Sequence, residues 1–219
     1  MTEPFRLDGV FSVLPTAFRD DGGLDLVGTA SLVRAARDAG VAGLTVLGVM
    51  GEAAELPIVI QDYPAGSGVG VTAGEIAAVA AAQPLVVGVK AEAPPTSGAI
   101  ATLRESNPGL GLVGGLGGLF LIDELRAGAN GVMTGFALPE RLVSIVGAFP
   151  TDPAAAEREW VDLLPLMRLE AFPPLSLAAR KEVWRLRGVI GSSSCRRSGA
   201  WLDDRARDDD RRALARMGS

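Results

Sequence analysis

The chain has no histidine and is poor in several other residues on which enzymes commonly depend. Its 219 residues include one cysteine, Cys195, and one tyrosine, Tyr63. Ser-His-Asp and Cys-His arrangements are therefore excluded, and so are the usual zinc ligand sets. A single cysteine cannot form an internal disulfide and suits a reducing cytosol, so we expect a cytoplasmic protein. Proton transfer is left to Tyr63, the lysines and the carboxylates.

The chain also has little of the charge and apolar length that mark nucleic-acid-binding and membrane proteins. A net charge of −5 and an isoelectric point of about 4.9 leave no basic stripe for a phosphate backbone. The longest apolar stretch, residues 109–122, is glycine-rich and shorter than the roughly 20 residues of a membrane span. No cationic segment followed by an apolar core opens the chain. We expect no nucleic acid and no membrane as partners, but small molecules.

Lysine is scarce as well, which makes Lys90 informative. The chain has two lysines against nineteen arginines, and Lys90 closes the apolar run PLVVGVK at residues 84–90. An arginine keeps its charge, whereas a lysine amine in an apolar pocket can lose its proton and attack a carbonyl to form a Schiff base. The alternative is a lysine at a strand end whose ammonium group extends into water. Position alone leaves both interpretations open.

The apolar periodicity indicates strands and helices in alternation around one sizeable core. Short apolar runs predict buried parallel strands at residues 10–14, 43–47, 57–60, 85–90, 111–115 and 131–134. Helical patterns occur at residues 26–39, 73–82, 97–104, 119–126 and 139–148. This alternation predicts a parallel α/β fold over residues 1–150. Residues 151–219 are expected to be a helical extension packed on it, with helices at 153–170, 175–187 and 203–217 and a solvated or disordered tail after about residue 195.

One connection is too short for this scheme. Nine residues, 48–56, separate the strands expected at 43–47 and 57–60. A crossover between parallel neighbours takes a dozen residues or more. Either these strands are not neighbours, or a segment is missing between them, and we give the second explanation more weight.

Five motifs, taken in order, resemble those of the dihydrodipicolinate synthase and N-acetylneuraminate lyase family. They are GVFSVLPTAF at 9–18, GVMGE at 48–52, QDYP at 61–64, GVKAE at 88–92 and GVMTG at 131–135. The resemblance covers about residues 6–190 and implies a (β/α)8 TIM barrel of the class I aldolase type with added C-terminal helices. Lys90 would condense with pyruvate or another 2-oxo acid. The third and fourth β/α units are missing, a deficit of roughly 75 residues at the short connection.

The resemblance also implies roles for individual residues. The backbone amides of Val49 and Met50 would hold the substrate carboxylate, a site that does not depend on side chains. Gln61 stands where the family has a relay tyrosine, and Tyr63, two residues later on a strand, should point to the same side. We therefore expect Tyr63 to shuttle protons and Gln61 to be a polar contact. Met133 matches an apolar residue that lines the family's pocket, with core packing as the alternative.

Other positions depart from the family or leave its pattern open. Valine at 49 cannot relay protons as the family's threonine does, and Gly66 replaces an arginine that grips a second carboxylate. Dihydrodipicolinate synthesis itself is therefore doubtful. Glu92 can hydrogen-bond the iminium region or be a solvated strand-end carboxylate. The glycine run at 114–118 lets a ligand approach the backbone, and Asp123 and Glu124 look like a solvated helix start.

These features predict a Schiff-base lyase or aldolase that acts on pyruvate or a related 2-oxo acid. The expected catalytic residues are Lys90 and Tyr63, and the expected substrate contacts are Val49, Met50, Gln61 and Met133. The resemblance implies no metal and no cofactor, because the iminium is the electron sink, and it implies a homo-oligomer. The alternative, favoured by the short connection, is a catalytically inactive relative that binds a 2-oxo acid or acts as an interaction protein.

Overall fold

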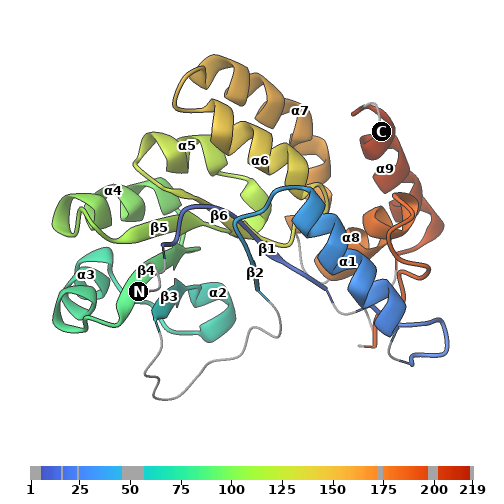
Figure 1. Ribbon diagram of the computed structural model, residues 1–219, viewed down its shortest axis with the longest axis horizontal. Coiled ribbons are helices and arrows are strands. Elements are labelled where there is room, and N and C mark those ends of the chain that lie inside the picture. Colours follow the sequence, from blue (N-terminus) through green and yellow to red (C-terminus); the bar gives the residue numbers. More distant parts are fainter. Residues whose placement is uncertain are drawn as a thin grey trace.

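The chain forms one curled parallel sheet with helices packed around it. The computed structural model describes residues 6–15, 17–23, 25–45, 57–171, 175–196 and 202–217. Helices α3, α4, α5 and α6 follow the outer side of the curve (Figure 1). In chain order the elements are β1 (Gly9–Val13), α1 (Leu26–Asp38), β2 (Gly43–Thr45), β3 (Ile58–Asp62), α2 (Pro64–Ser67), α3 (Ala73–Ala82), β4 (Val86–Ala91), α4 (Thr96–Ser106), β5 (Gly111–Gly114), the 3-10 helix η1 (Leu116–Gly118), α5 (Leu121–Arg126), β6 (Gly131–Thr134), α6 (Pro139–Ala148), α7 (Pro153–Ala171), α8 (Ser176–Leu186) and α9 (Asp204–Ala215).

The six strands are parallel and lie in the order β2-β1-β6-β5-β4-β3. The parallel sheet predicted from six apolar runs is confirmed. Strands β2 and β3 follow one another in the chain but form the two opposite edges of the sheet. Within the described ranges the sheet thus has six of the eight strands of a closed (β/α)8 barrel, and it curls into an incomplete barrel.

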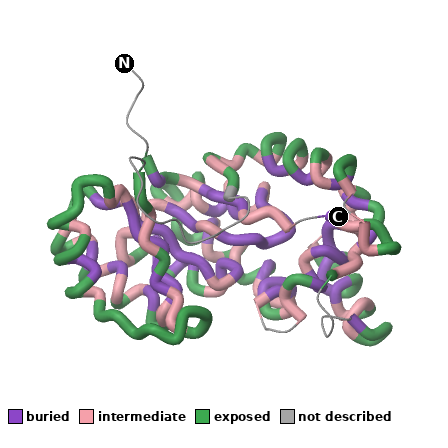
Figure 2. The backbone as a smooth tube through the Cα atoms, turned by 90° about the horizontal axis from the view of Figure 1, so that it is seen from below, coloured by how far each residue is buried: buried purple, intermediate pink, exposed green. Residues whose placement is uncertain are grey.

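The two faces of the sheet bury different sets of side chains. The helix-covered face packs Val89 and Ala91 of β4 against α3 and α4. On the inner face, Phe11 and Val113 pack with Leu7 in a smaller cluster. Because successive residues of a strand point to opposite faces, the side chain between Val89 and Ala91 faces inward. Figure 2 shows buried backbone in the middle of the sheet, whereas the edge strand β3 has only Asp62 buried.

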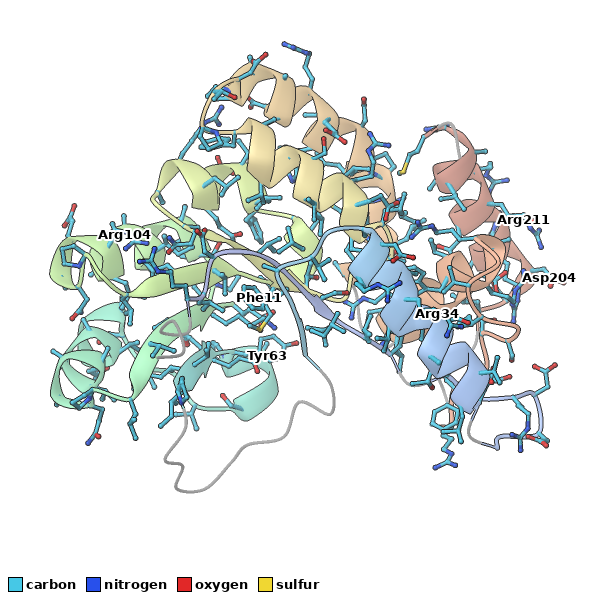
Figure 3. All side chains as sticks on the ribbon, viewed as in Figure 1. Phe11, Arg34, Tyr63, Arg104, Asp204 and Arg211 are labelled. Carbon is cyan, nitrogen blue, oxygen red and sulfur yellow. The ribbon has the colours of Figure 1, made fainter. Side chains whose placement is uncertain are left out.

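The largest core lies where α6, α7 and α8 meet the sheet, and α9 packs against α7 and α8. Asp210, Ala213 and Leu214 of α9 are buried, while Asp204 and Arg211 lie on its outer face (Figure 3). Helix α9 lies within the helix predicted at 203–217, and its apolar stripe is buried while its charged outer face is exposed.

The first residues of helices α3 and α6 are determined by their local sequence. In α3 the Thr72 hydroxyl accepts a hydrogen bond from the Glu75 amide at 3.2 Å, and the Glu75 carboxylate accepts one from the Thr72 amide at 2.8 Å. This reciprocal capping box fixes the first turn, and α6 begins with Pro139, whose fixed backbone angle suits that position. Both helices begin and end at their predicted residues. None of the helices in the described ranges is long and apolar enough to cross a bilayer.

Candidate active site

Lys90 lies at the carboxyl end of β4 and faces the inside of the curled sheet. It is in register with Gln61 of β3 and Val113 of β5, and residues paired in this way point to the same face. Its side chain is only 11% exposed. The alternative of an ammonium group that extends into water is therefore wrong. The carboxyl ends of the strands are where (β/α)8 barrels carry their reacting groups.

Glu92 is the immediate partner of the lysine amine. Its Oε2 lies 3.0 Å from Lys90 Nζ and accepts a hydrogen bond of 2.6 Å from Gln61 Nε2. Its Oε1 accepts a hydrogen bond of 3.0 Å from the Leu116 amide. With a side chain only 8% exposed, this carboxylate is not the solvated strand-end group that was the alternative. Three donors fix it against the amine.

The glycine run after β5 makes room for this carboxylate. A Cβ atom on Gly115 would lie 2.1 Å from Glu92 Oε1, so any side chain there would displace the carboxylate. The next residue, Leu116, has a φ of +46°, a left-handed conformation that costs a non-glycine residue about 1–3 kcal/mol. We expected the run to let a ligand approach the backbone. In the structure the absent side chain of Gly115 leaves space for the Glu92 carboxylate, and the amide of Leu116 donates a hydrogen bond to it.

A cavity of about 250 Å³ opens beside this pair. Its polar lining includes Gln61, Tyr63 and Lys90, so the structure brings three of the predicted site residues together. Tyr63 does not lie on the strand, as the argument from alternation assumed, but directly after β3, where α2 begins (Figure 3). A Cβ atom on Gly66 would lie 2.4 Å from Cε1 of Tyr63, so the missing side chain there leaves room for the phenol ring.

Comparison with known proteins finds similarity among solved structures. Searches of protein-family models and of curated proteins give no match. A dihydrodipicolinate synthase from Rhodopseudomonas palustris is 27% identical with a TM-score of 0.88, covering 95% of this chain and 97% of that chain. In fold and in the order of its motifs the chain is similar to the dihydrodipicolinate synthase family.

Two further members of the family share the fold at lower identity. The dihydrodipicolinate synthase from Thermotoga maritima is 19% identical with a TM-score of 0.86, and the match covers 98% of this chain and 99% of that one. YagE, a prophage protein of the dihydrodipicolinic acid synthase family from E. coli that was determined in complex with pyruvate, is 17% identical with a TM-score of 0.83. That match covers 96% of this chain and 98% of YagE.

The remaining residues predicted from the family are not brought to the cavity. Met133 packs against Phe11 and Val113 in the inner cluster and does not contribute to the cavity lining, in keeping with the core-packing alternative. Val49 and Met50 lie outside the described residues, so the carboxylate-binding role of their amides stays a prediction.

Arg180 was missed by the sequence reasoning and lines the same cavity. It extends from α8 across Gly135, where a Cβ atom would lie 2.7 Å from its Nη1. Its Nη2 donates to the Glu170 carbonyl at 3.2 Å, and its Nε lies 3.6 Å from Glu170 Oε2. The family motifs end before α8, so no motif pointed to this arginine. Thr134 and Ser176 add hydroxyl groups to the lining.

A second buried carboxyl lies behind the first. Glu124 is fully buried and accepts a hydrogen bond of 2.7 Å from the Thr96 hydroxyl. Burial raises the pKa of Glu124 to about 7, with a smaller contribution in the same direction from Glu92. The prediction that Glu124 belongs to a solvated helix start is therefore wrong, whereas Asp123 is exposed as expected. A Cβ atom on Gly114 would lie 1.7 Å from Glu124 Oε2, so this glycine too makes room for a carboxyl.

In the ranges that the structure describes, no group of three or more His, Cys, Asp or Glu side chains is placed to hold a metal ion. What the cavity offers is an amine held against a carboxylate, a phenol, two hydroxyl groups and a guanidinium. These groups can bind an anionic carbonyl compound and move protons at its carbonyl oxygen and at the carbon next to the carbonyl.

Proposed function

We propose that the protein is a Schiff-base-forming lyase or aldolase that acts on pyruvate or a related 2-oxo acid. The observation that carries the proposal is the pair formed by Lys90 and Glu92, 3.0 Å apart and almost buried at the carboxyl ends of the strands. Burying an ion pair costs desolvation free energy, and a lysine that served only in packing would not need to bear that cost. The proposed cellular location is the cytoplasm, and the proposed assembly is a homo-oligomer.

The first step is attack of the Lys90 amine on the ketone carbon. The amine must be neutral to attack, and Glu92 Oε2 is placed to take its proton. The new C–N bond gives a carbinolamine. Return of the proton from Glu92 to the carbinolamine hydroxyl releases water and leaves an iminium ion beside the ionised carboxylate. The charges of the resting pair are thereby restored, with the substrate attached.

Tyr63 is proposed to shuttle the proton that leaves the carbon next to the iminium, whose C–H electron pair forms the enamine double bond. Its ring lies in the same cavity and its hydroxyl can both donate and accept. Gln61 donates one of its two amide N–H groups to Glu92, so its contact with substrate would use the other N–H group or the amide oxygen. Val49 and Met50 amides are proposed to hold the 2-oxo acid carboxylate, as in the family, while Met133 would contribute only through the packing beneath.

The other lysine is a poor competitor for this role. Burial lowers the pKa of Lys181, which is the direction that favours a neutral amine. However, Lys181 is 1% exposed, its Nζ donates to the Ser194 carbonyl, and it lies 4.8 Å from the centre of the Phe18 ring. A substrate carbonyl would have to displace these contacts. Lys181 is therefore a natural internal control.

The test is reductive trapping. Treatment with pyruvate and borohydride should add one reduced pyruvyl group, which peptide mass spectrometry should locate on Lys90. Lys90→Arg should abolish the adduct and leave the fold largely intact, because arginine keeps the charge but stays protonated. Absence of an adduct, or an adduct on Lys181, would contradict the mechanism.

The second candidate is a catalytically inactive relative that binds a 2-oxo acid. The observation that favours it is the incomplete sheet, whose edge strands β2 and β3 do not close a barrel in the described part of the chain. The two functions differ in turnover. A protein that is trapped on Lys90 by pyruvate, yet consumes no pyruvate with any aldehyde offered, would be the binding protein.

A further inference from the structure

The cavity beside Lys90 contains a second cation that the proposed Schiff-base chemistry does not use. Arg180 reaches it from α8, an element separate from the strands that carry Lys90 and Gln61. The contacts of the guanidinium in the described residues lie on the side of Glu170, through Nη2 at 3.2 Å and Nε at 3.6 Å. The Nε atom is buried without a hydrogen-bond acceptor. Part of the donor capacity of this arginine is thus unused.

The carboxyl that faces Arg180 is a weak counter-ion. Glu170 is 0% exposed, and its Oε2 accepts only a hydrogen bond of 3.2 Å from the Ala137 amide. Burial raises the pKa of Glu170 to about 8, although Arg180 opposes the rise. Glu170 does not line the cavity, whose charged lining residues are Lys90, Glu92 and Arg180. Since Lys90 is already paired with Glu92, the cavity has a net positive charge.

The backbone is arranged so that the guanidinium can reach the cavity. Gly135, directly after β6, carries no side chain, and a Cβ atom there would lie 2.7 Å from Arg180 Nη1 and 2.9 Å from the Val13 carbonyl. Any larger residue would push the guanidinium away. The hydroxyl groups of Thr134 and Ser176 line the same space. A polar, positively charged pocket of this kind suits a carboxylate.

We propose that Arg180 forms a second anion-binding subsite, so that the reactants carry a carboxylate in addition to the one beside the ketone. This inference rests on the proposed function for the identity of the first group. The second carboxylate has two possible sources: the far end of a dicarboxylic 2-oxo acid, or an aldehyde partner that is itself an acid. Arg180 is a specificity-determining residue in both cases.

The first arm of the test compares 2-oxo acids with one and two carboxylates. Half-maximal trapping of Lys90 by borohydride should need about tenfold less 2-oxoglutarate than pyruvate, the effect of one charge-assisted hydrogen bond. Arg180→Gln should remove this advantage, so its loss should be about tenfold larger for 2-oxoglutarate than for pyruvate. Arg180→Lys, which keeps the charge, should retain part of the advantage. An equal loss for both acids would place the guanidinium on the first carboxylate and overturn the second subsite.

The second arm asks whether the carboxylate belongs to an aldehyde partner. With pyruvate present, the rate of pyruvate consumption is measured with succinic semialdehyde and with butanal, which lacks the carboxylate. Arg180→Gln should slow the reaction with succinic semialdehyde about tenfold more than the reaction with butanal if the acid aldehyde is the source. A preference for 2-oxoglutarate in the first arm without this effect assigns the subsite to the dicarboxylic 2-oxo acid.

A third measurement keeps this inference separable from the proposed function. Glutarate has two carboxylates and no ketone, so its binding, measured by titration calorimetry, requires no Schiff base. Binding that Arg180→Gln weakens about tenfold or more supports the subsite even if Lys90 is never trapped. Glutarate binding that is the same in the natural protein and in Arg180→Gln, with both folded by circular dichroism, overturns it.

Discussion

Glu92 is the residue on which the proposed chemistry most depends after the lysine itself. Its carboxylate receives the Lys90 amine, the Gln61 amide and the Leu116 backbone amide at 2.6–3.0 Å. Such a carboxylate cannot rotate away, so it stays where a proton from the amine must go. Neutral glutamine has the same shape but cannot accept that proton.

Glu92→Gln should therefore slow formation of the trapped pyruvate adduct on Lys90 at pH 7 by about a hundredfold, the lower range for loss of a general base. The rate should recover in part as the pH rises, because hydroxide can then replace Glu92 as the base. The measurement is the rate of adduct formation against pH. Glu105→Gln, at an exposed position of α4, is the control. A pH-independent loss would mean that Glu92 is only structural.

Glu124 makes a prediction about stability. Because burial raises its pKa to about 7 from the ordinary 4.5, the folded protein holds a proton that the unfolded chain releases between these values. The stabilisation is complete below pH 4.5 and is lost as the pH rises through 7, at about 1.4 kcal/mol for each unit of pKa shift. Urea unfolding of Glu124→Gln should show a smaller loss of stability from pH 5 to pH 8 than the natural protein.

Glutamine retains a partner for the Thr96 hydroxyl and does not ionise, which is why the effect should be confined to the pH dependence. Glu170 and Asp210, whose pKa values burial raises to about 8 and about 7, still titrate in the variant, so some slope should remain. Identical slopes in both proteins would show that Glu124 is already ionised in the folded state at neutral pH.

At the level of elements, strands β2 and β3 are the two edges of the sheet, and each has one strand neighbour among the described residues. Edge strands present unpaired N–H and C=O groups that invite pairing with another chain. Apolar side chains lie there too: Leu44 of β2 and Ile58 of β3 are each 38% exposed. The edges are therefore the most association-prone parts of the molecule.

We expect the 219-residue chain to associate or to be poorly stable, as judged by size-exclusion chromatography over a range of concentrations. Ile58→Lys should shift the chain toward monomer, because a charged side chain on an edge strand opposes pairing. Val161→Lys, at a position of α7 that is 49% exposed and away from both edges, should not. A well-behaved monomer with cooperative unfolding would refute this reasoning about edges.

The elements differ in how well the sequence predicts them. Helices α3 and α6 match their predicted bounds because a capping box and a proline mark their starts. The short α2 and η1 were not predicted, since neither has an apolar period and each follows directly on a strand. The missed helix α2 is also why Tyr63 was expected on a strand.

The site residues show the same limit. Lys90 could be found because an isolated lysine ends an apolar run. The burial of Glu92 and Glu124 could not, because it depends on the space left by Gly115 and Gly114. These glycines approach the two carboxyl groups only when β4, β5 and α5 pack together. Arg180 is about ninety residues away from Lys90 in the chain and is brought to the cavity by the packing of α8. Contacts of this kind leave no local pattern for a single sequence to show.

On the scale of the whole molecule, the central feature is an incomplete barrel that keeps the amine, the carboxylate and the phenol of one site together. These groups come from β3, β4 and the residues that follow them. Strands β4, β5 and β6 lie side by side in the sheet and, with their helices, form a continuous part of the fold (Figure 1). The site can therefore form although the sheet does not close.

Native mass spectrometry of the protein after treatment with pyruvate and borohydride tests this account most directly, because it reports the assembly and the covalent adduct together. The account predicts chains of 22.6 kDa that each carry one reduced pyruvyl group while still folded and associated. The Lys90→Arg protein should show the same assembly without the group. A folded protein that takes up no pyruvyl group under these conditions would contradict the account.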